Sequence, residues 1–184
     1  MKLTISELKK HLKQLDSNEI IQLIAELHKI DEKAQLFFSL QFEGEETAQE
    51  LLIQEKTQMK KDFSFTRRGV LKLHLPDVKK RIREFAKLTN DRMRITDLQL
   101  FFVELGTEFT VTYGDIDEAF YTNMENMFAQ VIKTCESNEE LYKAFHSRLR
   151  QVVSDSIGTG WGYHDILSDL YENLEFHYDN EEDY

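Results

Sequence analysis

Helix-breaking residues are scarce in this chain. Its 184 residues include one proline and seven glycines. Proline interrupts a helix because it lacks a backbone N–H and clashes with the preceding turn, and glycine costs about 1 kcal/mol per helical position relative to alanine. Good helix formers such as leucine, glutamate, lysine and glutamine are plentiful. The composition therefore favours long helices.

Four short motifs mark predicted helix starts. Each has a capping residue followed three positions later by glutamate, a pattern in which the two side chains satisfy N–H groups of the first helical turn. The four pairs are Thr4 with Glu7, Asp16 with Glu19, Asp115 with Glu118, and Ser137 with Glu140. Apolar residues at helical spacing follow each pair, so we expect a helix after each one.

The spacing of apolar residues predicts eight or nine helices in total. The expected ranges are 5–15, 17–30, 32–41, 45–61, 76–88 and 96–111, then helices after 115 and after 137, and a last one around 166–174. Short loops between them indicate an all-α fold, a multi-helix bundle, with a short helical solenoid as the minor option.

Residues 63–75 break the helical period, because apolar and polar residues alternate there. This pattern fits either a short β-hairpin or an extended connection. We favour the extended connection, since two isolated strands are marginally stable in water.

The length of the chain suits a single domain. We expect one helical domain over residues 1–178, in which residues 1–43 form a helical hairpin with a third helix packed on it. Residues 179–184 are expected to form a disordered acidic tail. The charged N-terminus lacks the apolar segment of a secretory signal, and no apolar run approaches the ~20 residues that span a membrane. These features predict a cytoplasmic protein with no membrane partner.

Basic residues are concentrated in the middle of an otherwise acidic chain. Residues 56–94 hold 13 of the 23 basic residues and 4 of the 34 acidic ones, so this basic island has a net charge of +9 within a chain of net charge −11. Its candidate binding residues are Arg67, Arg68, Lys79, Lys80, Arg81, Arg83 and Lys87. Such a patch could bind a nucleic-acid backbone or an acidic protein, or it could dock on the acidic C-terminal half or on a second copy of the chain.

Two further motifs suggest a pocket. Glu104 and Glu108 share one helix face, and with Asp115 and Asp117 they could offer oxygen ligands to a divalent cation. The plainer interpretation is helix capping and solvated carboxylates.

Trp161, His164 and Asp165 lie in and just after the glycine-rich loop, where they could form a pocket wall or simply a turn that packs on neighbouring helices. The full candidate pocket comprises Glu104, Glu108, Tyr113, Asp115, Asp117, Trp161, His164 and Asp165.

No established catalytic signature is present. The only cysteine, Cys135, lies on an apolar helix stripe and is expected to be a core residue. The six histidines include no pair four positions apart, and the glycines after residue 157 follow a predicted helix, unlike those of a dinucleotide-binding loop. The sequence therefore assigns no catalytic residue and leaves any metal or cofactor unknown.

Two blocks of sequence carry a family resemblance. The first comprises residues 103–109 and 113–121, with the run Gly114-Asp115-Ile116-Asp117-Glu118, and the second is residues 160–165, Gly-Trp-Gly-Tyr-His-Asp. With the opening residues 8–15 and the basic stretch around Arg67 and Arg68, they resemble DUF6155, a family of bacterial proteins of unknown function. The resemblance implies a bacterial, cytoplasmic, helical protein, and it carries no activity, cofactor or catalytic residue with it.

We consider three functions. The leading hypothesis is a non-enzymatic protein-interaction module, whose partner is a second copy or another protein. The first alternative is nucleic-acid binding through residues 56–94. The second is a metal-dependent or acid–base enzyme with an acidic and histidine-containing pocket.

Overall fold

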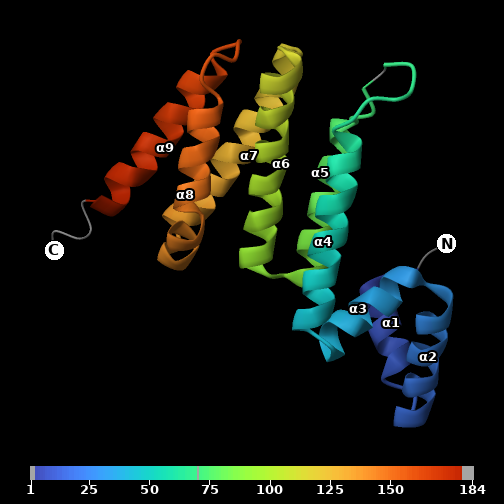
Figure 1. Ribbon diagram of the computed structural model, residues 1–184. Helices are drawn as coiled ribbons and strands as arrows, with labels where there is room; N and C mark the ends of the chain where they lie inside the picture. Colours follow the sequence, from blue (N-terminus) through green and yellow to red (C-terminus); the bar gives the residue numbers. More distant parts are fainter. Residues whose placement is uncertain (1–2, 70, 180–184) are drawn as a thin grey trace. The chain divides into compact units, whose positions relative to one another are not determined.

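The computed structural model describes residues 3–69 and 71–179. In this part of the chain it contains nine α-helices and no strand, which confirms the predicted all-α multi-helix bundle. Figure 1 shows the helices in order along the chain. They are α1 (Ile5–Leu12), α2 (Ser17–Ile30), α3 (Glu32–Phe42), α4 (Glu45–Asp62), α5 (Leu75–Thr89), α6 (Arg92–Tyr113), α7 (Glu118–Glu136), α8 (Glu139–Asp155) and α9 (Tyr163–Asp179).

The chain groups into two compact units, Met1–Ala48 and Gln49–Tyr184, which we call the N-terminal unit and the C-terminal unit. The boundary lies inside α4. This division does not test the expectation of one domain over residues 1–178, which stays a prediction. The expected acidic tail begins at Asp179, the last residue of α9, and its remaining residues, 180–184, lie outside the described part of the chain.

Two of the four predicted capping boxes are confirmed. The side chains of Thr4 and Asp16 accept hydrogen bonds from the N–H groups of Glu7 and Glu19, and each glutamate accepts one from the backbone of its cap residue in return. These reciprocal bonds fix where α1 and α2 begin, because they satisfy N–H groups that have no partner within the helix.

The other two capping predictions are wrong by one or two residues. Asp117 rather than Asp115 caps α7, and Asn138 rather than Ser137 caps α8. Both motifs contain two adjacent or nearly adjacent capping residues, so the sequence pattern does not decide between them. Asp115 instead accepts a hydrogen bond from Gly160 in the loop after α8.

The connection between α4 and α5 turns back on itself. Phe65 and Leu71 form one isolated antiparallel bridge, and the N–H of Lys72 donates to the carbonyl of Ser64 at 2.9 Å. Gly69, at a φ of +76°, adopts the left-handed conformation that the tight turn needs. The segment is thus a minimal hairpin that is held by one bridge and is too short to form strands. It is more closely paired than the extended connection that we favoured.

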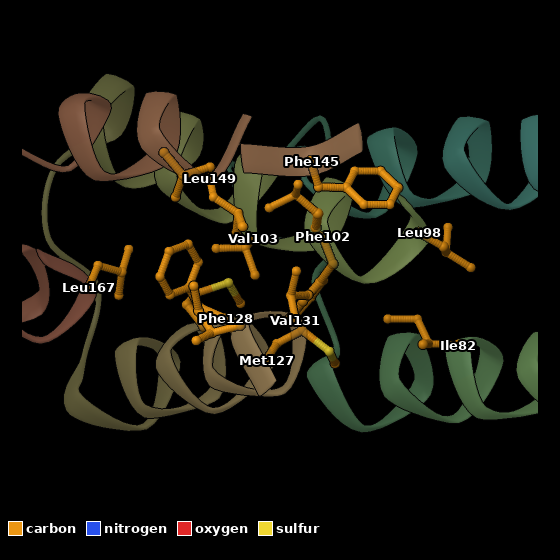
Figure 2. Packing of buried hydrophobic residues seen from close by; sticks show 14 of the residues in the cluster. Ile82, Leu98, Phe102, Val103, Met127, Phe128, Val131, Phe145, Leu149 and Leu167 are labelled. Atoms are coloured by element: carbon orange, nitrogen blue, oxygen red, sulfur yellow. The ribbon is translucent and has the colours of Figure 1, made fainter. Parts of the chain in front are cut away.

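Helix α6 is central in the C-terminal unit, where it packs against α5, α7 and α8, while α7 also packs against α8 and α9. The apolar residues of α6 lie on several sides of the helix, as expected for a helix that is surrounded by others. At Gly106, an added Cβ would lie 2.2 Å from the sulfur of Met124, so glycine allows α6 and α7 to approach closely. Figure 2 shows the core around these helices, with Phe102 and Val103 of α6, Met127, Phe128 and Val131 of α7, and Phe145 and Leu149 of α8.

Among the described residues, no helix combines the length and the apolar character that crossing a membrane requires.

Candidate functional site

The loops that follow α6 and α8 lie at the same end of the C-terminal unit (Figure 1). We call this region the loop end and define it as residues 107–121 and 156–164. It contains most of both sequence blocks on which the family resemblance rests. The structure therefore brings together two motifs that are far apart in the sequence.

Asp115 makes the direct connection between the two blocks. Its Oδ1 accepts a hydrogen bond from the backbone N–H of Gly160 at 3.0 Å and another from the hydroxyl of Tyr121 at 2.5 Å. The Tyr121 hydroxyl first and the Gly160 N–H second hold the pKa of the Asp115 carboxyl below its usual range, because both donors favour the charged form. A carboxylate at this position thus ties the loop after α6 to the loop after α8.

Buried hydroxyl groups extend this connection into the core. The Tyr121 hydroxyl lies 2.5 Å from Oγ1 of Thr110, and the Tyr163 hydroxyl lies 2.9 Å from Oγ1 of Thr107. Thr107 donates its own proton to the carbonyl of Val103, so Tyr163 must be the donor to Thr107. Burial, and then the Asp115 carboxylate, raise the pKa of Tyr121 to about 12. Both tyrosines therefore keep their protons near neutral pH and act as structural donors.

The loop around Gly160 leaves no room for a larger residue. A Cβ added at Gly160 would lie 2.4 Å from Oδ2 of Asp115. The next residue, Trp161, has a φ of +60°, which is unusual for any residue except glycine. Its side chain is 56% exposed. The loop thus holds a large aromatic ring outward in a backbone conformation that costs about 1–2 kcal/mol for a non-glycine residue.

His164 has a different environment from the carboxylates. Its Nδ1 lies 3.0 Å from Oγ of Ser156 and 3.1 Å from the carbonyl oxygen of Val153, at the C-terminal end of α8. Ser156 is fully buried and donates its own hydroxyl proton to the same carbonyl. His164 therefore anchors the start of α9 to the end of α8, while the adjacent Asp165 is exposed in the first turn of α9.

Glu104 lies in an ion-pair network away from the loop end. The Arg148 guanidinium donates to both Glu104 oxygens, at 2.7 and 2.8 Å, and to Asp97 at 2.6 Å. Lys56 of α4 pairs with the other oxygen of Asp97 at 2.7 Å. Burial alone would lower the pKa of Arg148, but the bonds and charges of Glu104 and Asp97 raise it overall. Glu104 thus joins α6 to α8, and Asp97 joins α6 to both α8 and α4.

Glu108 and Tyr113 lie beside a small surface cavity at the C-terminal part of α6. The cavity has a volume of about 310 Å³ and is also lined by Lys60 and Phe109. The ring of Tyr113 lies 5.0 Å from that of Phe65 and 4.8 Å from that of Phe109, measured between centroids. The turn between α4 and α5 therefore packs against the end of α6.

The predicted pocket residues consequently divide into separate groups. Asp115 bonds to the loop that carries Trp161, Asp117 caps α7, and Glu104 is paired with Arg148. Within the described residues, no group of three or more histidine, cysteine, aspartate or glutamate side chains has an arrangement that could hold a metal ion. Sequence patterns did not predict site roles for Thr107, Thr110, Tyr121, Ser156, Gly160 or Tyr163. The one available signal was the pair of threonines three positions apart amid apolar residues of one helix.

The predicted basic patch is partly neutralised within the C-terminal unit. Arg81 donates to Glu55 at 3.1 Å and to Asp62 at 2.5 Å, both on α4, and Lys79 donates to Asn123 of α7 at 2.7 Å. The remaining members are exposed: Arg67, Arg68, Lys80, Arg83 and Lys87. The carboxylates that bind Arg81 thus belong to α4 and not to the acidic C-terminal half.

The sequence in and around the loop end is acidic. Residues 111–125 and 151–172 contain no lysine or arginine. They contain eight carboxylates, which are Asp115, Asp117, Glu118, Glu125, Asp155, Asp165, Asp169 and Glu172. An exposed tryptophan within sequence segments of this charge is suited to contact a positively charged surface.

Over residues 3–175, the chain matches the family described as "Family of unknown function (DUF6155)". No curated protein and no solved structure matches it.

Proposed function

The chain belongs to the DUF6155 family, and on that premise we propose that it is a non-enzymatic protein-interaction module whose contact surface is the loop end. In this proposal Trp161 is the central contact residue. The partner is a protein segment that presents lysine or arginine side chains. We also propose that the protein is bacterial and cytoplasmic, as its sequence predicts.

The observation that carries the proposal is the constrained exposure of Trp161. A glycine at this position would avoid the cost of a positive φ, and an exposed indole contributes little to the core. Backbone strain at an exposed aromatic residue is the kind of feature that binding surfaces retain. Tryptophan is also enriched among the few residues that dominate binding energy at protein interfaces.

The bond between Asp115 and Gly160 supports the same conclusion. It fixes the loop before any partner arrives, so less conformational entropy is lost when the indole is buried in a complex. The dense hydroxyl network beneath the loop, through Tyr121 and Thr110, adds to this rigidity. A rigid loop with one projecting aromatic ring suits recognition of a preformed surface.

The acidic surroundings indicate the chemistry of the partner. Carboxylates on both sides of Trp161 attract a basic segment over a distance of about 10 Å at ordinary salt concentration. A lysine or arginine of that segment can also lie over the indole face. We therefore expect association to become slower as salt is added.

Nucleic-acid binding is a second candidate, favoured by a different surface. Phe65 and Tyr113 form an exposed aromatic pair, and Arg67 and Arg68 are exposed on the adjoining turn. Aromatic rings beside basic residues are typical of proteins that stack single-stranded bases. Binding of a fluorescent single-stranded oligonucleotide at low salt, lost in Arg67→Glu/Arg68→Glu, would support this candidate, and no binding at low salt would remove it.

The enzyme alternative stays a prediction without a specific observation in its favour. The hydroxyls of Tyr121 and Tyr163 serve as structural donors, and Nδ1 of His164 lies against the end of α8. A specific turnover of a small molecule that is lost in His164→Gln would revive it.

The proposal is tested by photo-crosslinking from position 161. Benzoylphenylalanine replaces Trp161 in the full chain. In a matched control it replaces Gln130, an exposed residue of α7 that lies about 18 Å along the helix from its first residue, Glu118. We expect one protein to crosslink from position 161 and not from position 130. It should attach through a segment rich in lysine or arginine, and the adduct should form again with the purified partner.

Two further observations complete this test. Asp115→Ala should weaken the crosslink because it releases the loop, and added salt should reduce it. The proposal is overturned if position 161 gives no adduct beyond those of position 130, or if its adduct does not depend on Asp115.

A further inference from the structure

We propose that the N-terminal unit is a self-association module, in which the apolar groove between α2 and α3 of one chain pairs with the same groove of a second copy. This goes beyond the proposed function, because it concerns a different unit and a different surface. The unit comprises α1, α2, α3 and the beginning of α4 (Figure 1, blue).

The N-terminal unit contains almost no core of its own. Neither α1 nor α2 has a buried residue, and α3 has only Leu40. Among the described residues of this unit, Ala48, near the start of α4, is the other buried apolar residue. A unit of 48 residues is near the size below which helices need oligomerisation or other support to be stable.

The apolar face of helix α2 is largely exposed in this unit. At about 100° per residue, its apolar side chains cover roughly half of the helix circumference. These side chains are Ile20, Ile21, Leu23, Ile24, Leu27 and Ile30. All except Ile20 are exposed, and Ile30 is 80% exposed. A helix with an apolar face this wide is normally packed against other helices.

The groove that this face forms with α3 lies entirely within the N-terminal unit. It has a volume of about 480 Å³ and is lined on the α2 side by residues that include Ile21, Ile24 and His28. On the α3 side, Phe38 and Phe42 stack with their ring centroids 6.4 Å apart. Phe42 is 84% exposed, so most of its surface is available to a second copy.

The charges of the unit identify a second copy as the occupant. Residues 5–15 carry Lys9, Lys10 and Lys13 against one carboxylate, Glu7. Residues 43–46, of which Glu43 lines the groove, carry three glutamates and no basic residue. In a two-fold symmetric pair, the basic helix of each copy can face the acidic segment of the other, so both contacts form at once. The surface is thus complementary to itself in charge as well as apolar.

The test is the association state of the full chain, measured by sedimentation velocity from low to high micromolar concentration. We expect a dimer that dissociates on dilution. Ile24→Asp and Phe42→Ser should each weaken dimerisation at least tenfold, because they place polar groups in the groove. Both residues are exposed, so these changes leave the core intact, and circular dichroism should show unchanged helix content.

Matched variants separate this interface from other surfaces. Ile53→Ser, on an exposed position of α4 in the C-terminal unit, and Trp161→Ala should leave dimerisation unchanged. Lys9→Glu/Lys10→Glu should weaken it, and adding Glu43→Lys/Glu46→Lys to the same chain should restore it. A chain that is monomeric at every concentration, or a dimer insensitive to both groove substitutions, would overturn the proposal.

Discussion

The carboxylate of Asp115 accepts a hydrogen bond from the backbone N–H of Gly160, which lies 45 positions later in the sequence, at 3.0 Å. The same oxygen accepts the proton of Tyr121, whose hydroxyl contacts Thr110 in the core. One side chain therefore couples two loops to α6 and α7. This coupling keeps Trp161 exposed and is the basis of the proposed binding surface.

The loop end should loosen in acid as Asp115 becomes protonated. The pKa of this carboxyl is lowered in the folded state, so its contribution to stability is complete above about pH 4, the unfolded value, and is lost as the pH falls through the lower folded value. Trp161 is the only tryptophan, so its emission reports on this loop alone. We expect a change in emission below about pH 4 that precedes loss of helix content.

Asp115→Asn is the control for this titration. Asparagine keeps an acceptor oxygen for Gly160 and Tyr121 but does not titrate. The early change in emission should therefore disappear in this variant. Identical acid profiles in the two proteins would show that another group is responsible.

Trp161→Gly should be more stable than Trp161→Ala by about 1 kcal/mol. Both substitutions remove the indole, and only glycine adopts a φ of +60° without strain. Urea denaturation followed by circular dichroism measures the difference. An alanine variant as stable as the glycine variant would mean that the backbone at position 161 is not strained.

Arg148→Met should destabilise the chain by about 2 kcal/mol. The substitution leaves Glu104 and Asp97 close together without the guanidinium that now binds both. Arg148→Lys should recover only part of the loss, because an amine cannot make the two parallel bonds to Glu104. Denaturant unfolding gives both values.

An exposed ion pair provides the comparison for Arg148. Lys143 and Glu139 pair on the surface of α8 with about two thirds of each side chain exposed. Lys143→Met should change stability by less than about 0.5 kcal/mol. If Lys143→Met lowers the free energy of unfolding as much as Arg148→Met does, the network around Arg148 stabilises the fold no more than an exposed ion pair.

Cys135 should react slowly with alkylating reagents in the native state. Burial raises the pKa of its thiol to about 11, and the side chain is inaccessible in α7. At mildly alkaline pH we expect alkylation on the order of 100-fold slower than in urea. Mass spectrometry of iodoacetamide-treated protein measures both rates, and equal rates would contradict the assigned burial.

Local sequence patterns predicted most of the helices because their determinants are local. The boxes at Thr4 and Asp16 fixed two helix starts, and apolar spacing identified all nine segments. The family resemblance, carried by the blocks around Asp115 and Trp161, is confirmed over residues 3–175.

Long-range partners could not be predicted in the same way. Glu104 pairs with Arg148, 44 positions away, and nothing in the sequence around either residue indicates the other. Asp115 looked like a helix cap because Glu118 lies three positions later, but Asp117 is the residue that caps α7. The convergence of the two sequence blocks depends on how α6, α7, α8 and α9 pack, which is a property of the whole C-terminal unit.

The most direct test of the proposed function is the affinity of the partner that crosslinks to position 161. Its dissociation constant should be measured by calorimetry for the wild-type chain, for Trp161→Ala and for Asp115→Ala. We predict at least a tenfold loss of affinity for Trp161→Ala, as expected for a central interface tryptophan, and a smaller loss for Asp115→Ala. Equal affinities for the three proteins would show that the loop end is not the contact surface.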